Sequence, residues 1–277
     1  MTIELILLVI FFGFLLEYTD KTLGMGYGTV LAPILLIMGF DFFQIMPAIL
    51  VPQIISGIIV GVLHHKKGNA DFKPKSTNVL KIKEKVREYG FLKSIKKGLP
   101  LHLKIAIIFG LSSVIGTVLA VFVAVNISQV YLKTYIGVLV LAMGILMFFT
   151  RNKKILFMKK RILAIGFLAS FNKGISGGGY GPVVTSGQVL SGLTAKNAIA
   201  ITSLSEGLTC STALIAYYLV NSSTIDWTLA PILVIGSLVA IPFSVSTVCK
   251  TDKEKLKVPV SLFTILLGLF TLIKVFF

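Results

Sequence analysis

The sequence predicts an all-α polytopic membrane protein made of two inverted halves. Three observations carry this prediction. Of the 277 residues, 55% are hydrophobic and only 14% are charged; long apolar runs recur along the chain; and one glycine-rich motif occurs twice. A soluble domain carries about 25% charged residues, and a helix needs about 20 apolar residues to cross a bilayer. The composition, with only 2 cysteines, excludes a disulfide scaffold and a disordered chain and disfavours a soluble domain.

Ten hydrophobic segments are expected to form helices or half-helices. They cover residues 2–19, 27–39, 43–63, 104–125, 130–149, 161–175, 182–192, 197–220, 227–248 and 256–277. The first segment lacks a basic region and a cleavage site, so we expect a membrane segment and not a signal peptide. The segments 27–39 and 182–192 follow glycine clusters and are too short to cross a bilayer alone.

Basic residues gather in three hydrophilic loops. The net charge is +16, and 22 of the 27 Lys and Arg residues lie within 66–104, 151–161 and 250–257. Cytoplasmic loops of membrane proteins carry such an excess, so we expect these loops inside and both termini outside. This placement argues against a nucleic-acid partner and favours contact with anionic lipid. Within the loop 64–101, the stretch 79–97 is interpreted as a basic surface helix, with a solvated linker as the alternative.

A shift of 153 residues places residues 23–40, LGMGYGTVLAPILLIMGF, on residues 176–193, SGGGYGPVVTSGQVLSGL. The same shift places Gln53 on Glu206, and Asp20-Lys21 resembles Asn172-Lys173 when one residue is gapped. The loop charges orient the two halves oppositely. We therefore expect a five-plus-five inverted repeat with two glycine-broken re-entrant helix hairpins. Its halves are residues 1–150, which include the basic loop, and residues 151–277.

Inverted repeats with broken helices are typical of transporters, which bind substrate near the membrane midplane. The short helices are expected to begin near Thr29 and Pro182, where free N–H groups and the helix dipole favour an anion. The predicted substrate-binding residues come from the two glycine motifs and from nearby polar positions within apolar segments. They are Gly24, Gly26, Tyr27, Gly28, Gln53, Asn172, Lys173, Gly177, Gly178, Gly179, Tyr180, Gly181 and Glu206.

Each group of these residues has an expected role. The glycines form a backbone anion cradle, and the tyrosines supply hydroxyl donors or an aromatic wall. Gln53 orients the substrate, and Glu206 is the proton-coupling candidate, with a structural hydrogen-bonding role as its alternative. Lys173 is the better ligand candidate, whereas Asp20 and Lys21 are left open between a site and a structural pair. A cation site would need several carboxylates at mid-depth, and Glu206 and Asp20 are the ones expected there.

Two stretches resemble a known family. GMGYGTVLAPILLIMGF with the following HH and GNADF, and FNKGISGGGYGPVVTSGQVLSG with AITSLSEGLTC, resemble the TauE/SafE-type sulfite and organosulfonate exporters over nearly the whole chain. The resemblance implies a secondary transporter in the cell membrane that moves a small sulfur-containing anion, such as sulfite, thiosulfate or an organosulfonate, by alternating access.

The same sequence sets the remaining expectations. We expect no enzymatic activity, no cofactor and no metal site, because His64 and His65 are adjacent and do not share a helix face. The expected partners are the anionic substrate and the lipid bilayer, and a homo-oligomer is left open. The alternatives left open are an ion channel and a transporter of an unrelated small solute.

Overall fold

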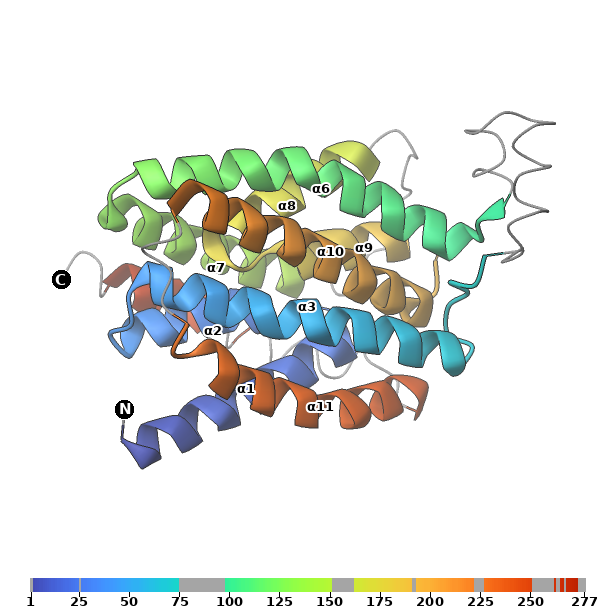
Figure 1. The fold of residues 1–277 in the computed structure, drawn as a ribbon, viewed down its shortest axis with the longest axis horizontal. Helices are drawn as coiled ribbons and strands as arrows, with labels where there is room; N and C mark the ends of the chain where they lie inside the picture. The colour runs from blue at the N-terminus through green and yellow to red at the C-terminus, as the bar shows by residue number, and fades with distance from the viewer. Residues whose placement is uncertain are drawn as a thin grey trace.

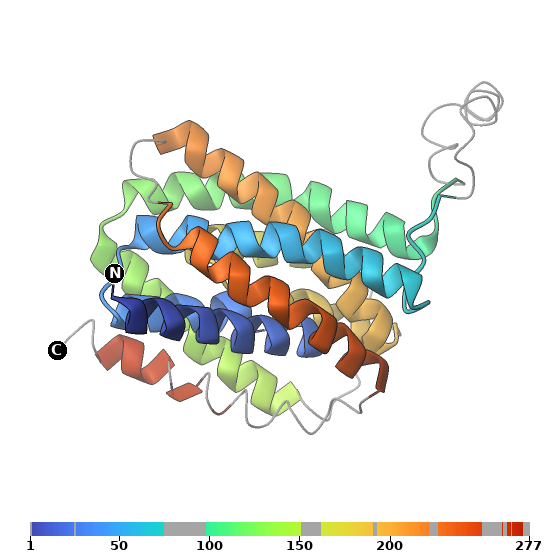
Figure 2. The ribbon, with the colours of Figure 1, turned by 60° about the horizontal axis from the view of Figure 1, so that its bottom comes forward.

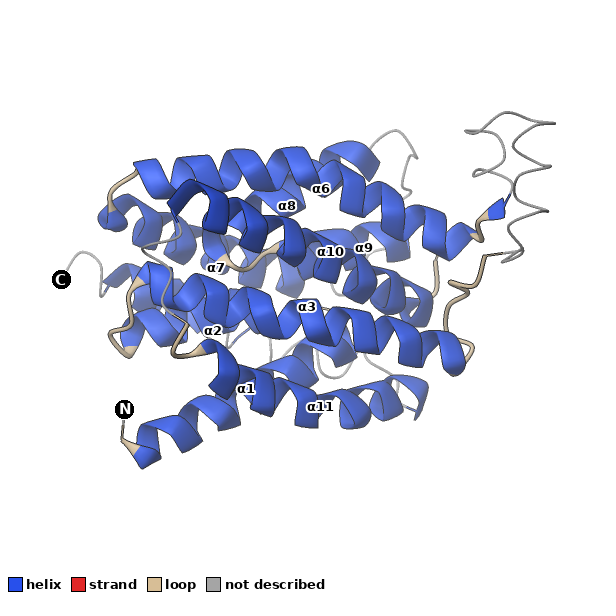
Figure 3. Cartoon of the chain, viewed as in Figure 1, coloured by secondary structure: helices blue, strands red, loops and turns tan. Residues whose placement is uncertain are grey.

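The described part of the chain is helical. A computed structural model describes residues 2–24, 26–74, 98–150, 162–190, 193–221 and 227–250, together with residues 262, 265–266 and 268–273. No strand occurs among these residues (Figure 3). The helices are α1 (Ile3–Leu23), α2 (Tyr27–Ile37), α3 (Phe42–Lys66), α6 (Leu101–Asn126), α7 (Gln129–Thr150), α8 (Ile162–Ser176), α9 (Tyr180–Leu190), α10 (Ala195–Asn221) and α11 (Ala230–Lys250). The described residues from 262 to 273 are helical as well.

Four of the described helices are long and apolar enough to cross a membrane: α3, α6, α10 and α11. Large apolar side chains lie exposed on their outer faces, including Leu111 and Phe122 on α6 and Phe243 on α11. Water would disfavour these faces, whereas lipid tails match them. The structure therefore agrees with the predicted class, an all-α polytopic membrane protein.

The two short segments form helices of eleven residues each, α2 and α9. Both begin at the tyrosine of the glycine motif, two residues before the expected starts near Thr29 and Pro182. Pro182 is the third residue of α9, where a missing N–H costs nothing because first-turn N–H groups have no intrahelical partner. Helix α1 continues past the apolar segment 2–19 to Leu23. The expected surface helix 79–97 lies outside the described residues.

The long helices run side by side, with α3 and α10 packed against each other in the centre (Figure 1). Helix α1 packs along α11 on one flank, and α8 packs along α6 on the other. Figures 1 and 2 show that α1 begins at the left end of the molecule, and Figure 1 shows the turn from α2 into α3 at that same end. In Figure 1 α8 begins toward the right, runs leftward, and α9 returns toward the right.

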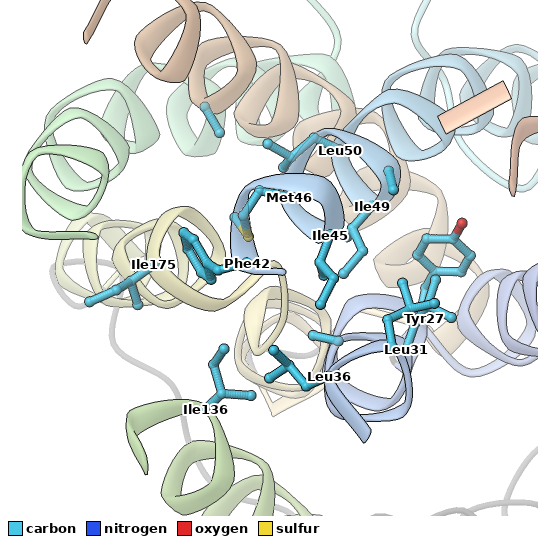
Figure 4. Close-up of a cluster of buried hydrophobic side chains, with 14 of the residues drawn as sticks. Tyr27, Leu31, Leu36, Phe42, Ile45, Met46, Ile49, Leu50, Ile136 and Ile175 are labelled. Carbon is cyan, nitrogen blue, oxygen red and sulfur yellow. The ribbon is translucent and has the colours of Figure 1, made fainter. Parts of the chain in front are cut away.

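An apolar cluster fills the half of the molecule that contains α2 and the start of α3. Figure 4 shows Leu31 and Leu36 of α2 facing Ile45 and Ile49 of α3, with Ile175 of α8 nearby. These side chains are at most 9% exposed. The first half-helix is thus held by hydrophobic packing.

Polar contacts join the helix ends on the opposite side, where α3 and α11 end and α6 and α10 begin. The Asn69 amide nitrogen lies 2.8 Å from His64 Nδ1 and 3.4 Å from Cys249 Sγ. Asn197 donates to the Asn69 carbonyl at 2.8 Å and lies 3.2 Å from His102 Nε2. The loop that follows α3 therefore ties four helices together at this end, and the histidines serve this network.

Candidate functional site

The helices α1 and α8 end in the same way, each at a glycine in the left-handed conformation. Gly24 has φ 76° and donates its N–H to the Asp20 carbonyl at 2.6 Å; Gly177 has φ 71° and donates to the Lys173 carbonyl at 2.9 Å. A residue with a Cβ is strained at such a φ, which explains the glycines. Asp20 and Lys173 therefore hold the same position relative to the glycine that ends each helix.

The starts of α2 and α9 touch each other. The Gly179 N–H donates to Thr29 Oγ1 at 3.0 Å. A Cβ on Gly178 would lie 2.7 Å from the backbone nitrogen of Thr29, and a Cβ on Gly28 would collide with the Gly177 carbonyl oxygen. Only glycine permits this approach of two backbones. The two glycine motifs, 153 positions apart in the sequence, thus meet inside the helix bundle.

Beside this contact lies a buried ionic cluster, which we define as Glu17, Asp20, Lys21, Lys173 and Glu206. The Lys21 ammonium lies 2.7 Å from Asp20 Oδ2 and 3.3 Å from Glu206 Oε2. The Lys173 ammonium lies 2.9 Å from Glu206 Oε1. Each of these side chains is at most 4% exposed. Glu206 therefore joins a lysine of α1 to a lysine of α8.

Gln53 completes the cluster from α3, because its amide oxygen accepts a hydrogen bond from Lys173. The thiol of Cys210 lies 3.8 Å from the same oxygen. The structure thus brings together three of the predicted site residues, Lys173, Gln53 and Glu206. It also places Asp20 and Lys21, which the sequence left open, in direct contact with them.

Sequence reasoning missed Glu17. This side chain is 0% exposed and its carboxylate lies 3.6 Å from the Lys21 ammonium, one helical turn further along α1. The buried cluster thus contains a third carboxylate, Glu17, beside Glu206 and Asp20, the two that the sequence analysis expected. The signal was present: a carboxylate inside an apolar run is costly unless paired, which is the argument that singled out Glu206.

The other predicted residues lie around the cluster. Tyr27 and Tyr180 are 0% exposed, and the Tyr27 hydroxyl accepts a hydrogen bond from Ser237 of α11 at 3.3 Å. Tyr180 packs in an apolar cluster with Phe109 of α6. Asn172 accepts a hydrogen bond from the Tyr135 hydroxyl at 2.6 Å. Its polar end is therefore held by α7, whereas the next residue, Lys173, enters the ionic cluster.

Two backbone N–H groups near the helix starts already have side-chain partners in this conformation. Tyr27 donates its N–H to Asp20 Oδ1 at 3.2 Å, and Gly178 donates to Ser176 Oγ at 3.2 Å. The Asp20 carboxylate thus occupies the position at the start of α2 that favours an anion. The two lysines are the groups with charge to offer a small anion.

Metal binding finds no support in the described part of the chain. No group of three or more His, Cys, Asp or Glu side chains there has an arrangement that could hold a metal ion. The carboxylates of the cluster surround the Lys21 ammonium. The site is built to hold charged amino groups and carboxylates against one another.

Comparison with known families agrees with this site. Residues 89–271 match the family described as Sulfite exporter TauE/SafE. The chain belongs to the TauE/SafE family. Searches of curated proteins and of solved structures return no match.

The match supports a transmembrane transporter, as do the apolar helices. It includes Lys173, the second glycine motif and Glu206, and it begins after Lys21 and the first glycine motif. The resemblance noted from the sequence extended over both halves of the chain, whereas the family match begins at residue 89. The TauE/SafE assignment therefore rests on α6 to α11.

Proposed function

We propose that this protein is a secondary transporter that moves a small sulfur-containing anion across the cell membrane by alternating access. The family description names sulfite, and the two buried ammonium groups suit such an anion; thiosulfate and organosulfonates are the related substrates in this proposal. The observation that carries the proposal is the position of Glu206 between the buried ammonium groups of Lys21 and Lys173. Buried lysines at membrane depth mark substrate or ion pathways.

The binding step follows from this geometry. Glu206 holds the space between the two lysines while no substrate is bound. The substrate oxyanion takes its place and receives charge-assisted hydrogen bonds from both ammonium groups. Gln53 orients the anion through its amide group, and the glycine contact places both half-helix starts beside it. Once displaced from the lysines, the Glu206 carboxylate binds a proton, which couples the anion to the proton gradient.

An inverted repeat supplies the conformational change. The halves we assign are residues 1–150 and 151–277, with five helices or half-helices each. Helix packing supports this assignment: α1 lies along α11 as α8 lies along α6, and α3 pairs with α10. The helix pair α1–α2 and the pair α8–α9 enter from opposite ends in Figure 1 and meet at their glycines. Such re-entrant hairpins fit a rocking motion around a central site.

The two ends of the pathway differ in polarity. Thr185 and Gln188 of α9 and Thr202 of α10 are buried and hydrogen-bonded to one another. A shift of 153 positions replaces Thr185 and Thr202 by Ala32 and Ile49, both part of the apolar cluster between α2 and α3. The described conformation therefore supports a polar route on the α9–α10 side and an apolar closure on the α2–α3 side.

The polar route faces the cytoplasm in this proposal. The end of the molecule where α3 and α11 finish carries the basic residues Lys66, Lys67 and Lys250 among those described. Positive charge of this kind marks the inner side of a membrane protein. The N-terminus lies at the opposite end in Figure 1, so we place both termini outside.

Uptake measurements in liposomes test this function. The purified protein, reconstituted into liposomes, should take up labelled sulfite or thiosulfate, and an imposed inward proton gradient should increase the rate. Empty liposomes provide the background. Sulfate and taurine serve as comparison solutes for selectivity. Currents of single-channel size in a planar bilayer, or no uptake of any sulfur oxyanion, would contradict the proposal.

A further inference from the structure

The ionic cluster has more acids than bases. Three carboxylates, Glu17, Asp20 and Glu206, face two ammonium groups, Lys21 and Lys173, and all are at most 4% exposed. Full ionisation would leave one uncompensated negative charge at membrane depth. Such a charge is costly where the side chains are at most 4% exposed. One bound proton makes the closed cluster neutral.

Geometry distinguishes the three carboxylates. Asp20 lies 2.7 Å from Lys21 and accepts the Tyr27 N–H as well. Each oxygen of Glu206 faces a lysine. Glu17 lies 3.6 Å from Lys21, and neither of its oxygens has a hydrogen-bond partner among the described residues. Glu17 is therefore the carboxylate that gains least from being charged.

The groups around Glu17 do not make up for the missing hydrogen bonds to its carboxylate. From α1 it faces Asp20 and Lys21, from α10 it faces Glu206, and from α2 the phenol of Tyr27. From α3 it faces Ser56, whose hydroxyl is also buried without a partner in the described structure. The charged residue of α11 is Lys250, the last residue of that helix. Ser56 can accept a hydrogen bond from a protonated Glu17 or donate one to an ionised Glu17, so Ser56 suits both forms, whereas the two acidic neighbours repel the ionised form alone.

We propose that Glu17 is a proton-binding site, separate from the place where the anion binds, and that its protonation allows the empty and the loaded transporter to close. This inference rests on the proposed function. The substrate anion displaces Glu206 from the two lysines, and Glu206 then binds a proton. Glu206 therefore couples the anion to the proton gradient. Glu17 binds a proton in every closed state, so it sets how fast all modes of transport run at a given pH.

Exchange of labelled thiosulfate for unlabelled thiosulfate tests this inference, with the same pH on both sides of the liposome. Thiosulfate keeps its charge from about pH 6 to about pH 9, so the substrate does not titrate. We expect wild-type exchange to fall by up to tenfold for each pH unit once Glu17 loses its proton. Glu17→Gln mimics the protonated acid and should exchange with a shallower pH dependence than the wild type, because only the contribution of Glu206 remains. The exposed Glu4 on the same helix provides the control Glu4→Gln, which should keep the wild-type profile.

Two results would overturn the inference. One is a Glu17→Gln protein with the wild-type pH profile, and the other is a folded Glu17→Gln protein that exchanges nothing at any pH. If Glu17→Gln does not fold, Ser56→Ala replaces it: loss of the hydroxyl should shift the midpoint of the pH profile, and an unchanged midpoint would count against a proton at Glu17.

A measurement without substrate separates this inference from the proposed function. A proton bound in the closed fold stabilises it at low pH, and this contribution is lost as the pH rises. The melting temperature of the wild type in detergent should therefore fall more from about pH 6 to about pH 9 than that of Glu17→Gln. A wild type that exchanges no thiosulfate would refute the proposed function and leave this result standing. Equal slopes for both proteins would refute the role of Glu17.

Discussion

Replacing Lys173 by Met separates a substrate site from a structural ion pair. Met keeps most of the length of the side chain but removes the ammonium group that lies 2.9 Å from Glu206 and donates to Gln53. Lys21 still faces Glu206 at 3.3 Å, so the carboxylate keeps one of its two partners.

The expected magnitudes follow from these contacts. Removing one partner of a buried ion pair costs about 3–5 kcal/mol. Because Lys21 still faces Glu206, we expect a loss near about 3 kcal/mol. For a chain of this size the melting temperature should fall by about 6–12 °C. An anion would lose one charge-assisted hydrogen bond of about 1.5–3 kcal/mol, which corresponds to about 10-fold to 150-fold weaker binding.

Thermal unfolding in detergent and equilibrium binding of labelled sulfite measure the two effects. The double variant with Lys173→Met and Glu206→Gln restores the charge balance, so it should recover part of the lost stability without recovering anion binding. The exposed Lys67 provides the control Lys67→Met, which should change neither quantity. Sulfite affinity within twofold of the wild type in Lys173→Met would refute the assignment of Lys173 to the anion.

Three further predictions address coupling, the glycine contact and topology. Glu206→Gln should fold and bind the anion, but an imposed pH gradient should no longer drive its accumulation in liposomes; accumulation equal to that of the wild type would make Glu206 structural. Gly178→Ala forces a Cβ to 2.7 Å from the α2 backbone and should cost about 1–3 kcal/mol in thermal unfolding, while Gly98→Ala, with nothing within 4 Å, should cost less than 1. Single cysteines at Asn126 and Lys67, in a background without native cysteines, should react with impermeant thiol reagents from outside and inside, respectively; labelling from the same side would refute the proposed topology.

The helices were largely predictable from the sequence because the bilayer imposes apolar runs of defined length. The segments 43–63 and 197–220 fall within α3 and α10. The half-helix starts were displaced because a helix begins where the backbone turns, at the left-handed glycines, and not at the proline. The end of α1 was placed too early, because its last turn carries charges that pair inside the bundle.

The ionic cluster was predictable only in part. Lys173, Gln53 and Glu206 stood out as polar residues within apolar segments, but their contacts join positions up to 185 residues apart and depend on how the two halves meet. Asn172 and Lys173 are neighbours in sequence and point toward different helices, which a motif alone does not separate. Glu17 satisfied the same criterion as Glu206 and was nevertheless missed.

The central claim is that the substrate anion binds between Lys21 and Lys173 and displaces Glu206. A structure of the protein with selenite, a heavier oxyanion with the shape of sulfite, tests it most directly, because the position of selenium can be recognised without reference to the protein. The account predicts selenium between the two ammonium groups, with oxygen atoms within hydrogen-bonding distance of both and the Glu206 carboxylate moved away. Selenium bound elsewhere, with Glu206 still in contact with both lysines, would contradict the account.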